Sequence, residues 1–295
     1  MPFRGTGHEL RELRERLGGF DLRPGDTVLV VDNTPGSEAD RPAGAGGTGV
    51  LAAAGLSTPA YARNRGVAQG SAEWILFLDS DTLAPSDLLD RYFEQSPNDQ
   101  TGILAGPVAD EEAPRGGGAA ARYAYQRGIA SQETTLSFAK RSYPKTSNAA
   151  FRRVAFLQAA GFREEIRAGE DADLCYRLEA IGWETERREG AGVVHKNRQR
   201  VRSFAAQRAV HGAGAAWLDR HYPGSFPARR VPGLLWWGVR TVAGALGSAV
   251  WARDRDPAVY AFMEIIDDIA FELGRSLPNE RPLPRNPVAF LERSR

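Results

Sequence analysis

The chain has 295 residues, which is long enough for one large domain or for a domain with an appendage. Its hydrophobic residues (42%), charged residues (25%) and mean hydropathy of −0.40 are ordinary for a globular protein. A net charge of +1 gives no reason to expect nucleic acid as a partner. A single cysteine, Cys175, excludes an internal disulfide and a cysteine-based metal cluster. We expect a cytoplasmic protein, since the first residues also lack the apolar segment of a signal peptide.

The first part of the chain alternates predicted helices with predicted buried strands. Leucines spaced i, i+3, i+7 predict a helix over residues 8–17. An apolar run predicts a strand over 27–31, which stops at Asp32. Residues 37–49 are rich in Gly, Ala and Pro and are predicted to form a loop, and residues 60–70 a short helix.

An acidic pair ends the next predicted strand. Residues 74–78 form a continuous apolar run, which is typical of a parallel strand covered on both faces. Asp79 and Asp81 follow it directly, at the strand end where open α/β sheets bind ligands. Their hard oxygen atoms suit Mg²⁺ or Mn²⁺, although Asp-Ser-Asp is also a common turn composition. A helix is predicted to start next, with Ser86 as its N-cap.

The middle of the chain continues the mixture of strands and helices. Strands are predicted over 101–108, 183–187 and 192–195, helices over 123–138, 153–160 and 168–181, and a Gly-rich loop over 110–120. Acidic residues cluster in the first turn of the helix over 168–181, where the helix dipole alone could explain them. The strand over 192–195 ends in His195, which is either a structural histidine or a metal ligand.

The order of elements predicts a parallel α/β sheet with right-handed crossovers. Such a sheet would open with a strand before the helix over 8–17, and only the first four residues are available for it. We therefore expect the numbering to start inside or just after the first strand; the alternative is a fold that begins with a helix.

The C-terminal part differs in character. A basic helical stretch over 196–220 is followed by an apolar stretch over 234–251, an amphipathic helix over 256–273 and an extended Pro-rich end over 278–295. Arg240 near the middle of the apolar stretch disfavours a membrane span, because a central arginine costs roughly 2.5–3.5 kcal/mol. Packing on the catalytic domain or on a second subunit is the favoured interpretation, and an interfacial helix is the alternative.

Several separated segments resemble the inverting family 2 glycosyltransferases of the GT-A fold. These segments are Val30-Val31-Asp32-Asn33, Ala62-Arg63-Asn64-Arg65-Gly66, Phe77-Leu78-Asp79-Ser80-Asp81, Ser147 to Arg153, Gly161-Phe162 and Gly169 to Leu178. The resemblance implies a Rossmann-like, mostly parallel central sheet flanked by helices, with a GT-A domain over 1–205 and a C-terminal helical region over 206–295. It also implies a nucleoside-diphosphate sugar as donor, with a UDP-sugar favoured, and an acceptor of unknown identity.

The resemblance implies roles for individual residues. Pro2, Arg4, Asp32 and Arg63 would line the nucleotide pocket, and Asp79 and Ser80 would contact the ribose or the metal's water shell. Asp81 would ligate Mn²⁺ or Mg²⁺ together with Asp79 and His195. Asp171 would be the general base, with Glu170 beside it touching the acceptor. Asn33 departs from the acidic or hydroxyl residue usual after the Asp32 position, which leaves the base preference open.

The chemistry of glycosyl transfer requires these two groups of residues. A base takes the proton of the acceptor hydroxyl, and a cation neutralises the diphosphate leaving group. Repulsion between Glu170 and Asp171 is expected to raise one of their pKa values. The rival hypotheses are a nucleotidyltransferase of similar architecture and a binding-only member of the fold. A homodimer contact, or a peripheral contact at the inner face of the membrane through 231–273, is also left open.

Overall fold

The computed structural model describes residues 1–37, 48–114, 116–138, 140–227 and 256–282, with isolated positions between 233 and 241. The chain divides into two compact units. The first comprises Met1–Ala109, Ser131–His195 and the described residues from Glu280 on, and the second comprises Asp110–Ala130 and Lys196–Asn279. The predicted domain boundary at residue 205 stays a prediction. The predictions for 234–251 and for most of 278–295 lie outside the described residues.

The N-terminal sheet of the first unit is parallel, as predicted. Its order is β1 (Pro2–Phe3), β2 (Val28–Asp32) and β3 (Thr48–Ala52), and Phe3 and Ala52 both pair with Asp32. β3 was not predicted, because its sequence Thr-Gly-Val-Leu-Ala adjoins a loop-like stretch and gives a weak strand signal. Its pairing with β2 outweighs that local preference.

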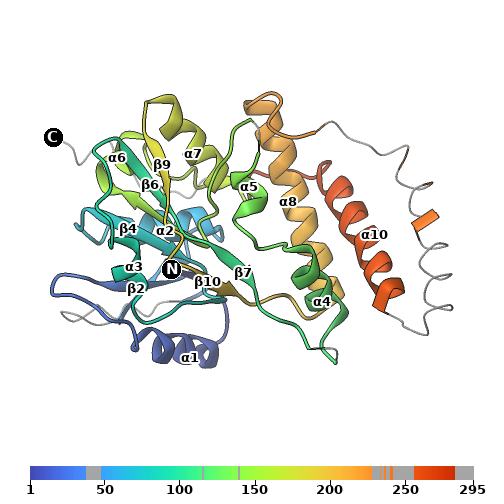
Figure 1. Ribbon diagram of the computed structural model, residues 1–295, viewed down its shortest axis with the longest axis horizontal. Coiled ribbons are helices and arrows are strands. Elements are labelled where there is room, and N and C mark those ends of the chain that lie inside the picture. The colour runs from blue at the N-terminus through green and yellow to red at the C-terminus, as the bar shows by residue number, and fades with distance from the viewer. Residues whose placement is uncertain are drawn as a thin grey trace. The chain divides into compact units, whose positions relative to one another are not determined.

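Two helices cover opposite faces of this sheet (Figure 1). α1 (Gly7–Leu17) packs Leu13 and Leu17 with Val30, whereas α2 (Pro59–Val67) packs Tyr61 and Ala62 with Val31. Successive residues of a strand point to opposite faces, so one apolar strand contacts both helices. The continuous apolar run of β2 therefore reflects its burial on two sides.

The second sheet has the order β4-β8-β6-β9, which mixes pairing directions. Its strands are β4 (Trp74–Leu78), β8 (Asn148–Arg152), β6 (Thr101–Ala105) and β9 (Glu184–Arg187). β8 runs antiparallel to both β4 and β6, whereas β6 and β9 are parallel. β4, β6 and β9 thus point the same way, and their carboxyl ends share one edge. β8 was not predicted, since the signal of the helix α6 (Arg153–Gln158) follows it at once.

A third, short sheet joins β5 (Thr82–Leu83), β10 (Val193–His195) and β7 (Val108–Asp110). The strand predicted over 101–108 is therefore two strands, and Gly106-Pro107 separates them. A Cβ on Gly106 would lie 2.4 Å from the carbonyl oxygen of Ala191, so a close backbone approach requires glycine there.

The short helices of the first unit differ from the predictions at their ends. α3 (Leu88–Tyr92) has Asp87 at its N-cap, and Ser86 is not the cap because its hydroxyl donates to Asp21 at 2.7 Å. The helix predicted over 123–138 is α4 (Ala119–Arg127) and α5 (Glu133–Leu136), because Gly128 in a left-handed conformation ends α4. α7 (Glu170–Ala180) starts two residues later than predicted.

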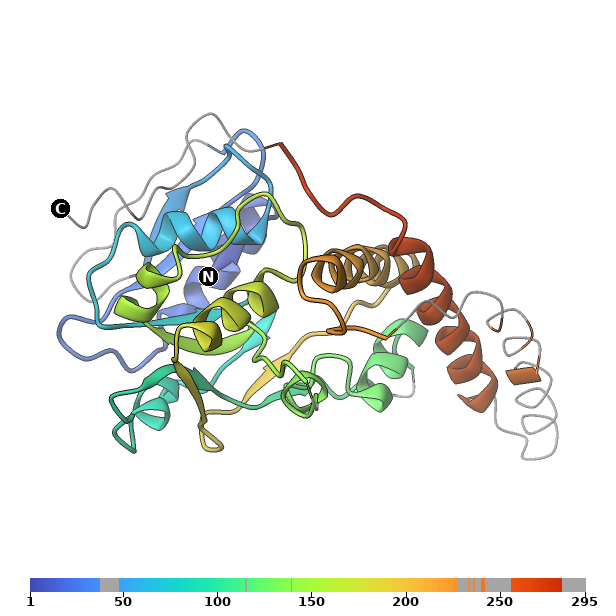
Figure 2. The ribbon, with the colours of Figure 1, turned by 90° about the horizontal axis from the view of Figure 1, so that it is seen from above.

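The second unit is helical. In addition to α4, it contains α8 (Val201–His221) and α10 (Asp256–Gly274). These two helices lie side by side in Figures 1 and 2. Gly212 and Gly274 permit the close approach, since a Cβ on either would lie within 2.1 Å of a carbonyl oxygen of the other helix. Within the described part of the chain, no helix combines the length and the apolar character that a membrane crossing needs.

Candidate active site

The carboxyl ends of β4, β6 and β9 form a continuous row. Register pairs join Leu78 to Asn148 and Ala105 to both Ala149 and Arg187, so the residues after these strands line one edge of the sheet. Asp79 and Asp81 follow β4 at this edge. Ligands of open α/β sheets bind at such an edge.

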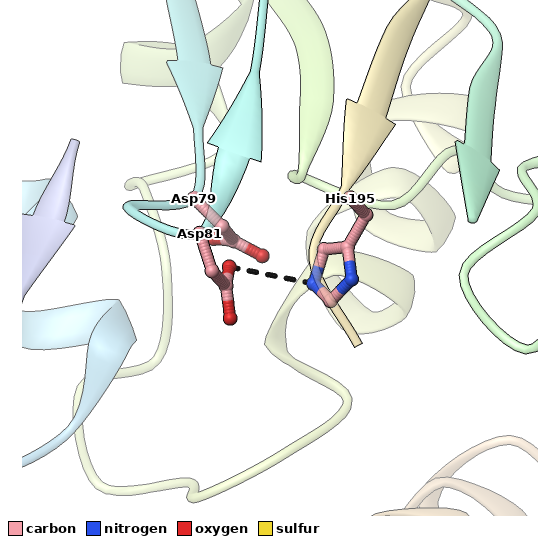
Figure 3. A group of neighbouring side chains, drawn as sticks. All are labelled: Asp79, Asp81 and His195. Atoms are coloured by element: carbon pink, nitrogen blue, oxygen red, sulfur yellow. Dashed lines mark ion pairs between the residues drawn. The ribbon is translucent and has the colours of Figure 1, made fainter. Parts of the chain in front are cut away.

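The structure brings Asp79, Asp81 and His195 together (Figure 3). One ligand atom from each lies within 4.8 Å of the others, and all three residues are half-buried. His195 Nε2 is 3.3 Å from Oδ1 of Asp81, because β10 pairs His195 opposite Thr82. Two carboxylates and one imidazole form a donor set that suits Mn²⁺ and is compatible with Mg²⁺. The residues predicted as ligands therefore fit a divalent cation.

Arg63 connects this cluster to the acidic start of α7. Its Nη2 donates to Oδ1 of Asp79 at 2.7 Å and its Nη1 donates to Oε1 of Glu170 at 2.7 Å. The arginine side chain is only 3% exposed. Burial lowers the pKa of Arg63, but Asp79 and Glu170 outweigh that effect and the net pKa is raised. Although the resemblance implied a place beside the nucleobase, Arg63 in this structure pairs with carboxylates from two different elements.

Asn64, the next residue of the same motif, holds the loop that leads to α7. Its amide nitrogen donates to the carbonyl of Phe162 at 2.8 Å and to Glu164 at 2.9 Å, and its oxygen accepts from the amide of Phe162 at 3.1 Å. Asn64 is buried to 1% exposure. Arg63 and Asn64 thus fix the path of the chain before Asp171 from two adjacent positions on α2.

Glu170 and Asp171 both have raised pKa values, and burial is the largest cause for each. The pKa of Glu170 is raised to about 7 by burial, with Arg63 opposing and Asp171 adding to the rise. The amide of Ala172 and then Arg63 offset part of the rise at Asp171. Repulsion within the pair, the expected cause, is therefore smaller than desolvation. A carboxylate with a raised pKa is a stronger base once ionised.

Asp32 ends β2 beside β1, so Pro2 to Arg4 lie next to it through the pairing of Phe3 with Asp32. Its carboxylate accepts from the amide of Thr34 at 3.0 Å and from the hydroxyl of Ser37 at 2.6 Å. Asn33 is buried and donates to the carbonyls of Ala53 and Leu56. The asparagine that departs from the family pattern therefore holds the loop after β3.

Ser80, predicted to contact the ribose or the metal's water shell, forms a hydrogen bond through its backbone. Its carbonyl accepts from Nη2 of Arg16 at 2.8 Å, which ties the turn between Asp79 and Asp81 to α1. The side chain of Arg4, predicted to line the nucleotide pocket, donates to the hydroxyl of Ser57 at 2.9 Å.

Tyr92 and Asn148 support the same edge and were not predicted as site residues. The hydroxyl of Tyr92 donates to the side chain of Asn148 at 2.8 Å and accepts from the amide of Gly106 at 3.1 Å. Asn148 in turn donates to the carbonyls of Pro107 and Ala191. Asn148 lies in a segment that resembles the family, whereas the sequence around Tyr92 contains no comparable signal.

A known family of enzymes matches the larger part of the chain. The family described as "Glycosyl transferase family group 2" matches residues 74–253, more than half of the chain. The chain belongs to this family. The prediction of a family 2 glycosyltransferase, made from motifs in residues 1–205, is thereby confirmed at the level of family.

Two curated relatives of the family 2 chain have the same name. They are the pre-mycofactocin glycosyltransferases of Mycobacterium tuberculosis strains CDC 1551 / Oshkosh and ATCC 25618 / H37Rv. Each is 28% identical over 262 residues, which cover 84% of this chain and 53% of the relative. The chain thus spans about half the length of the curated relatives it matches.

Among solved structures, the mannosyltransferase PcManGT from Pyrobaculum calidifontis is similar with a TM-score of 0.59 and 14% sequence identity. The match covers 93% of the family 2 chain and 85% of that structure, which contains GDP-Man and Mn²⁺. At this identity the likeness concerns the fold. The predicted GT-A architecture with C-terminal helices is confirmed.

Proposed function

We propose that the family 2 chain transfers a glycosyl group, with inversion, from a nucleoside-diphosphate sugar to an acceptor hydroxyl, with help from a divalent cation. The observation that supports this most directly is the pairing of two acidic sites through Arg63, whose nitrogens lie 2.7 Å from both Asp79 and Glu170. One site suits a cation and the other contains a candidate base. The glycosyltransferase relatives and the nucleotide-sugar complex of the mannosyltransferase support the same assignment.

Asp81, His195 and Asp79 would hold the cation. When bound, Mn²⁺ or Mg²⁺ would neutralise the negative charge that develops on the diphosphate as it leaves. Asp32, with Pro2 and Arg4 beside it, would bind the nucleoside, with a UDP-sugar as the favoured donor.

Asp171 would act as the general base of a single displacement. The acceptor oxygen forms a bond to the anomeric carbon while the bond from that carbon to the diphosphate oxygen breaks, and the acceptor proton moves to a carboxylate oxygen of Asp171. The candidate base and the candidate cation ligand Asp79 lie on different elements, at the start of α7 and after the end of β4. Glu170 is 93% buried and held by Arg63, so we assign it a positioning role rather than the acceptor contact implied by the resemblance.

A titration of UDP, GDP and dTDP with and without Mn²⁺ tests the donor side. We expect one nucleotide to bind in a manner that needs both Mn²⁺ and Asp81, so that Asp81→Ala abolishes the metal-dependent part. Asp87→Ala is the matched control, because Asp87 is an exposed aspartate that pairs with Arg91. Binding that Asp81→Ala leaves unchanged would contradict the assignment of the cation site.

Turnover separates an enzyme from a binding-only member of the fold. Release of nucleoside diphosphate from the matching nucleotide sugar should be measurable in wild type, with water as a slow acceptor, and should fall in Asp171→Asn. Nucleotide binding without any release of diphosphate from any donor would favour the binding-only alternative. We also propose a domain boundary at residue 205 and a homodimer or membrane-surface contact through 231–273.

A further inference from the structure

A small cleft of mixed polar and apolar lining lies at the sheet edge that β4, β6 and β9 share, and the proposed transfer gives its lining no role. Its walls come from the β6–β7 turn, the start of α5 and the end of β9. The side chains that define it are Gln132, Glu133, Leu136, Arg187 and Glu189, with Gly106 at the turn. All of these residues belong to the first compact unit.

The register places this cleft beside the proposed reaction centre. Asp79 follows β4, and Gly106 follows β6, two strands further along the same edge. Neighbouring strands are 4.7–4.9 Å apart, so the two positions are separated by roughly 10 Å. That distance is comparable to the length of a disaccharide. A sugar at the anomeric centre could therefore reach the cleft, or a second sugar attached to it could.

Hydrogen bonds hold the wall on the side of α5 and connect it to Lys145, which interacts with the candidate base. Gln132 is only 3% exposed. Its side-chain nitrogen donates to the carbonyls of Lys145 and Asn148, and its side-chain oxygen accepts from the amide of Lys145. The Lys145 ammonium donates to the carbonyl of Ser131 and to Thr134. The positive charge of Lys145 also favours the ionised form of Asp171. The hydrogen bonds of Gln132 and Lys145 thus link the α5 side of the cleft to the surroundings of Asp171, the proposed base.

Across the cleft, Arg187 and Glu189 at the end of β9 face Glu133 of α5, and these side chains present both hydrogen-bond donors and acceptors to solvent. Arg187 donates to the two oxygens of Glu133 at 2.8 and 3.1 Å, and Glu189 lies 3.8 Å away. These side chains are 46%, 61% and 72% exposed. Ion pairs this exposed are weak, so a ligand can open them at little cost.

This combination favours a neutral, hydroxyl-rich ligand. A hydroxyl both donates and accepts, whereas a carboxylate only accepts and a guanidinium only donates. Two adjacent hydroxyls can therefore bind the separated partners, one on Arg187 and one on Glu133. Two carboxylates against one guanidinium leave the cleft net negative, which disfavours a phosphate or another anion.

We propose that this cleft is a saccharide subsite of the glycosyl transfer, in which Arg187 and Glu133 bind adjacent hydroxyls of a sugar ring. The inference rests on the proposed function for its place in the reaction. The sugar could be part of the acceptor or the glycosyl group of the donor, since both present the same hydroxyl chemistry. The two sources are separated by experiment.

Saturation-transfer NMR with methyl α-glucoside, methyl α-mannoside, methyl α-galactoside and methyl N-acetyl-β-glucosaminide tests the cleft directly. We expect transfer to at least one glycoside in wild type. Arg187→Ala and Glu133→Gln should each weaken it roughly threefold to tenfold, the effect of losing one or two hydrogen bonds. Arg23→Ala is the matched control, because Arg23 forms an exposed pair with Asp90 outside the cleft. Both variants alter exposed side chains, and thermal melting of each confirms its folding.

Competition assigns the source of the sugar. The nucleotide that binds with Mn²⁺ is added as the free diphosphate and, separately, as its hexose conjugate (UDP-glucose, GDP-mannose or dTDP-glucose). Displacement of the glycoside by the conjugate but not by the diphosphate indicates the donor sugar, and retention of the glycoside with both indicates the acceptor. Either result supports the subsite.

The proposal is overturned if no glycoside receives saturation in a folded wild type, or if Arg187→Ala and Glu133→Gln bind glycosides as Arg23→Ala does. The nucleotide titration is read in the same samples. Glycoside binding that depends on Arg187, in a protein that binds no nucleotide, would retain the saccharide site and reject the proposed function.

Discussion

Arg63 and Glu170 form a buried ion pair, with Nη1 of the arginine 2.7 Å from Oε1 of the glutamate. The two residues lie on α2 and at the first turn of α7, 107 positions apart in the sequence. Since Nη2 of the same guanidinium donates to Asp79, one arginine sets the position of the start of α7 relative to the residues that follow β4. Buried charges that lack partners are costly, so this pair should affect both stability and catalysis.

Arg63→Met should destabilise the fold by about 3–5 kcal/mol, because it leaves Glu170 buried without its partner. Urea unfolding of the two proteins measures this. Adding Glu170→Gln to Arg63→Met should recover much of the stability without restoring turnover, whereas Arg23→Met, in an exposed pair with Asp90, should cost no more than about 1 kcal/mol. Equal losses for Arg63→Met and Arg23→Met would contradict a structural role for the buried pair.

The raised pKa of Glu170 predicts that stability falls as pH rises. Burial raises the pKa from 4.5 to about 7 in the folded protein. The folded state therefore binds a proton more tightly than the unfolded state between these values, and its stabilising effect is complete below pH 4.5 and is lost as pH rises through 7. The loss is at most on the order of 3 kcal/mol.

The corresponding measurement is the free energy of unfolding from pH 4.5 to 8 without divalent cations. Glu170→Gln does not titrate, so its profile should be flatter than that of wild type over this window. Glu133→Gln is the control, because Glu133 is exposed and its pKa is lowered by the hydrogen bond from Arg187. Parallel profiles for wild type and Glu170→Gln would rule out the assigned pKa.

Sequence patterns were sufficient to predict where the candidate site residues lie along the chain, and less so the residues that support them. Asp32 and His195 end short apolar strands and Asp79 directly follows one, so these strand ends could be inferred from local periodicity. β8 could not be predicted in this way. Its only apolar stretch is Ala-Ala-Phe, which is too short for a clear pattern, and the strands that pair with it on both sides are distant in sequence. Tyr92 is 56 residues from the Asn148 it supports, and its hydroxyl has no local signature.

Contacts between residues distant in the sequence also explain why the roles of the residues on α2 were predicted only in part. The Ala-Arg-Asn motif indicated a functional segment, but only the structure separates Arg63, which joins two acidic sites, from Asn64, which fixes a loop. Likewise, the acidic start of α7 suggested mutual repulsion, whereas burial by tertiary packing is the larger cause of the raised pKa values. Long-range packing determines both outcomes, and local sequence does not encode it.

Asp171→Asn should lower the rate of transfer by roughly 10²–10⁴-fold, because a carboxamide cannot take the proton of the acceptor hydroxyl. Nucleotide and Mn²⁺ binding should stay within a factor of two or so of wild type, since Asp171 is not part of the cation cluster. Steady-state kinetics and calorimetry on the same samples separate the two effects. Asp87→Asn controls for the substitution at an exposed position. A variant that retains full turnover would exclude Asp171 as the base.

The close contact between α8 and α10 gives the last prediction, which concerns stability of the second unit. A Cβ on Gly212 would lie 2.0 Å from the carbonyl oxygen of Phe271, and one on Gly274 would lie 2.1 Å from that of Ala209. These neighbours are backbone atoms, so the helices would have to separate, and overpacking of this kind costs about 1–3 kcal/mol. Gly212→Ala and Gly274→Ala should therefore lower the free energy of unfolding, although alanine is the better helix former.

Thermal and urea unfolding of the two variants measure the effect, with Gly116→Ala as the control, since a Cβ there meets no described atom within 4 Å. The double variant should cost less than the sum of the single ones, because one displacement of the helices relieves both clashes. If Gly212→Ala and Gly274→Ala were as stable as Gly116→Ala, the tight helix contact would not exist in solution.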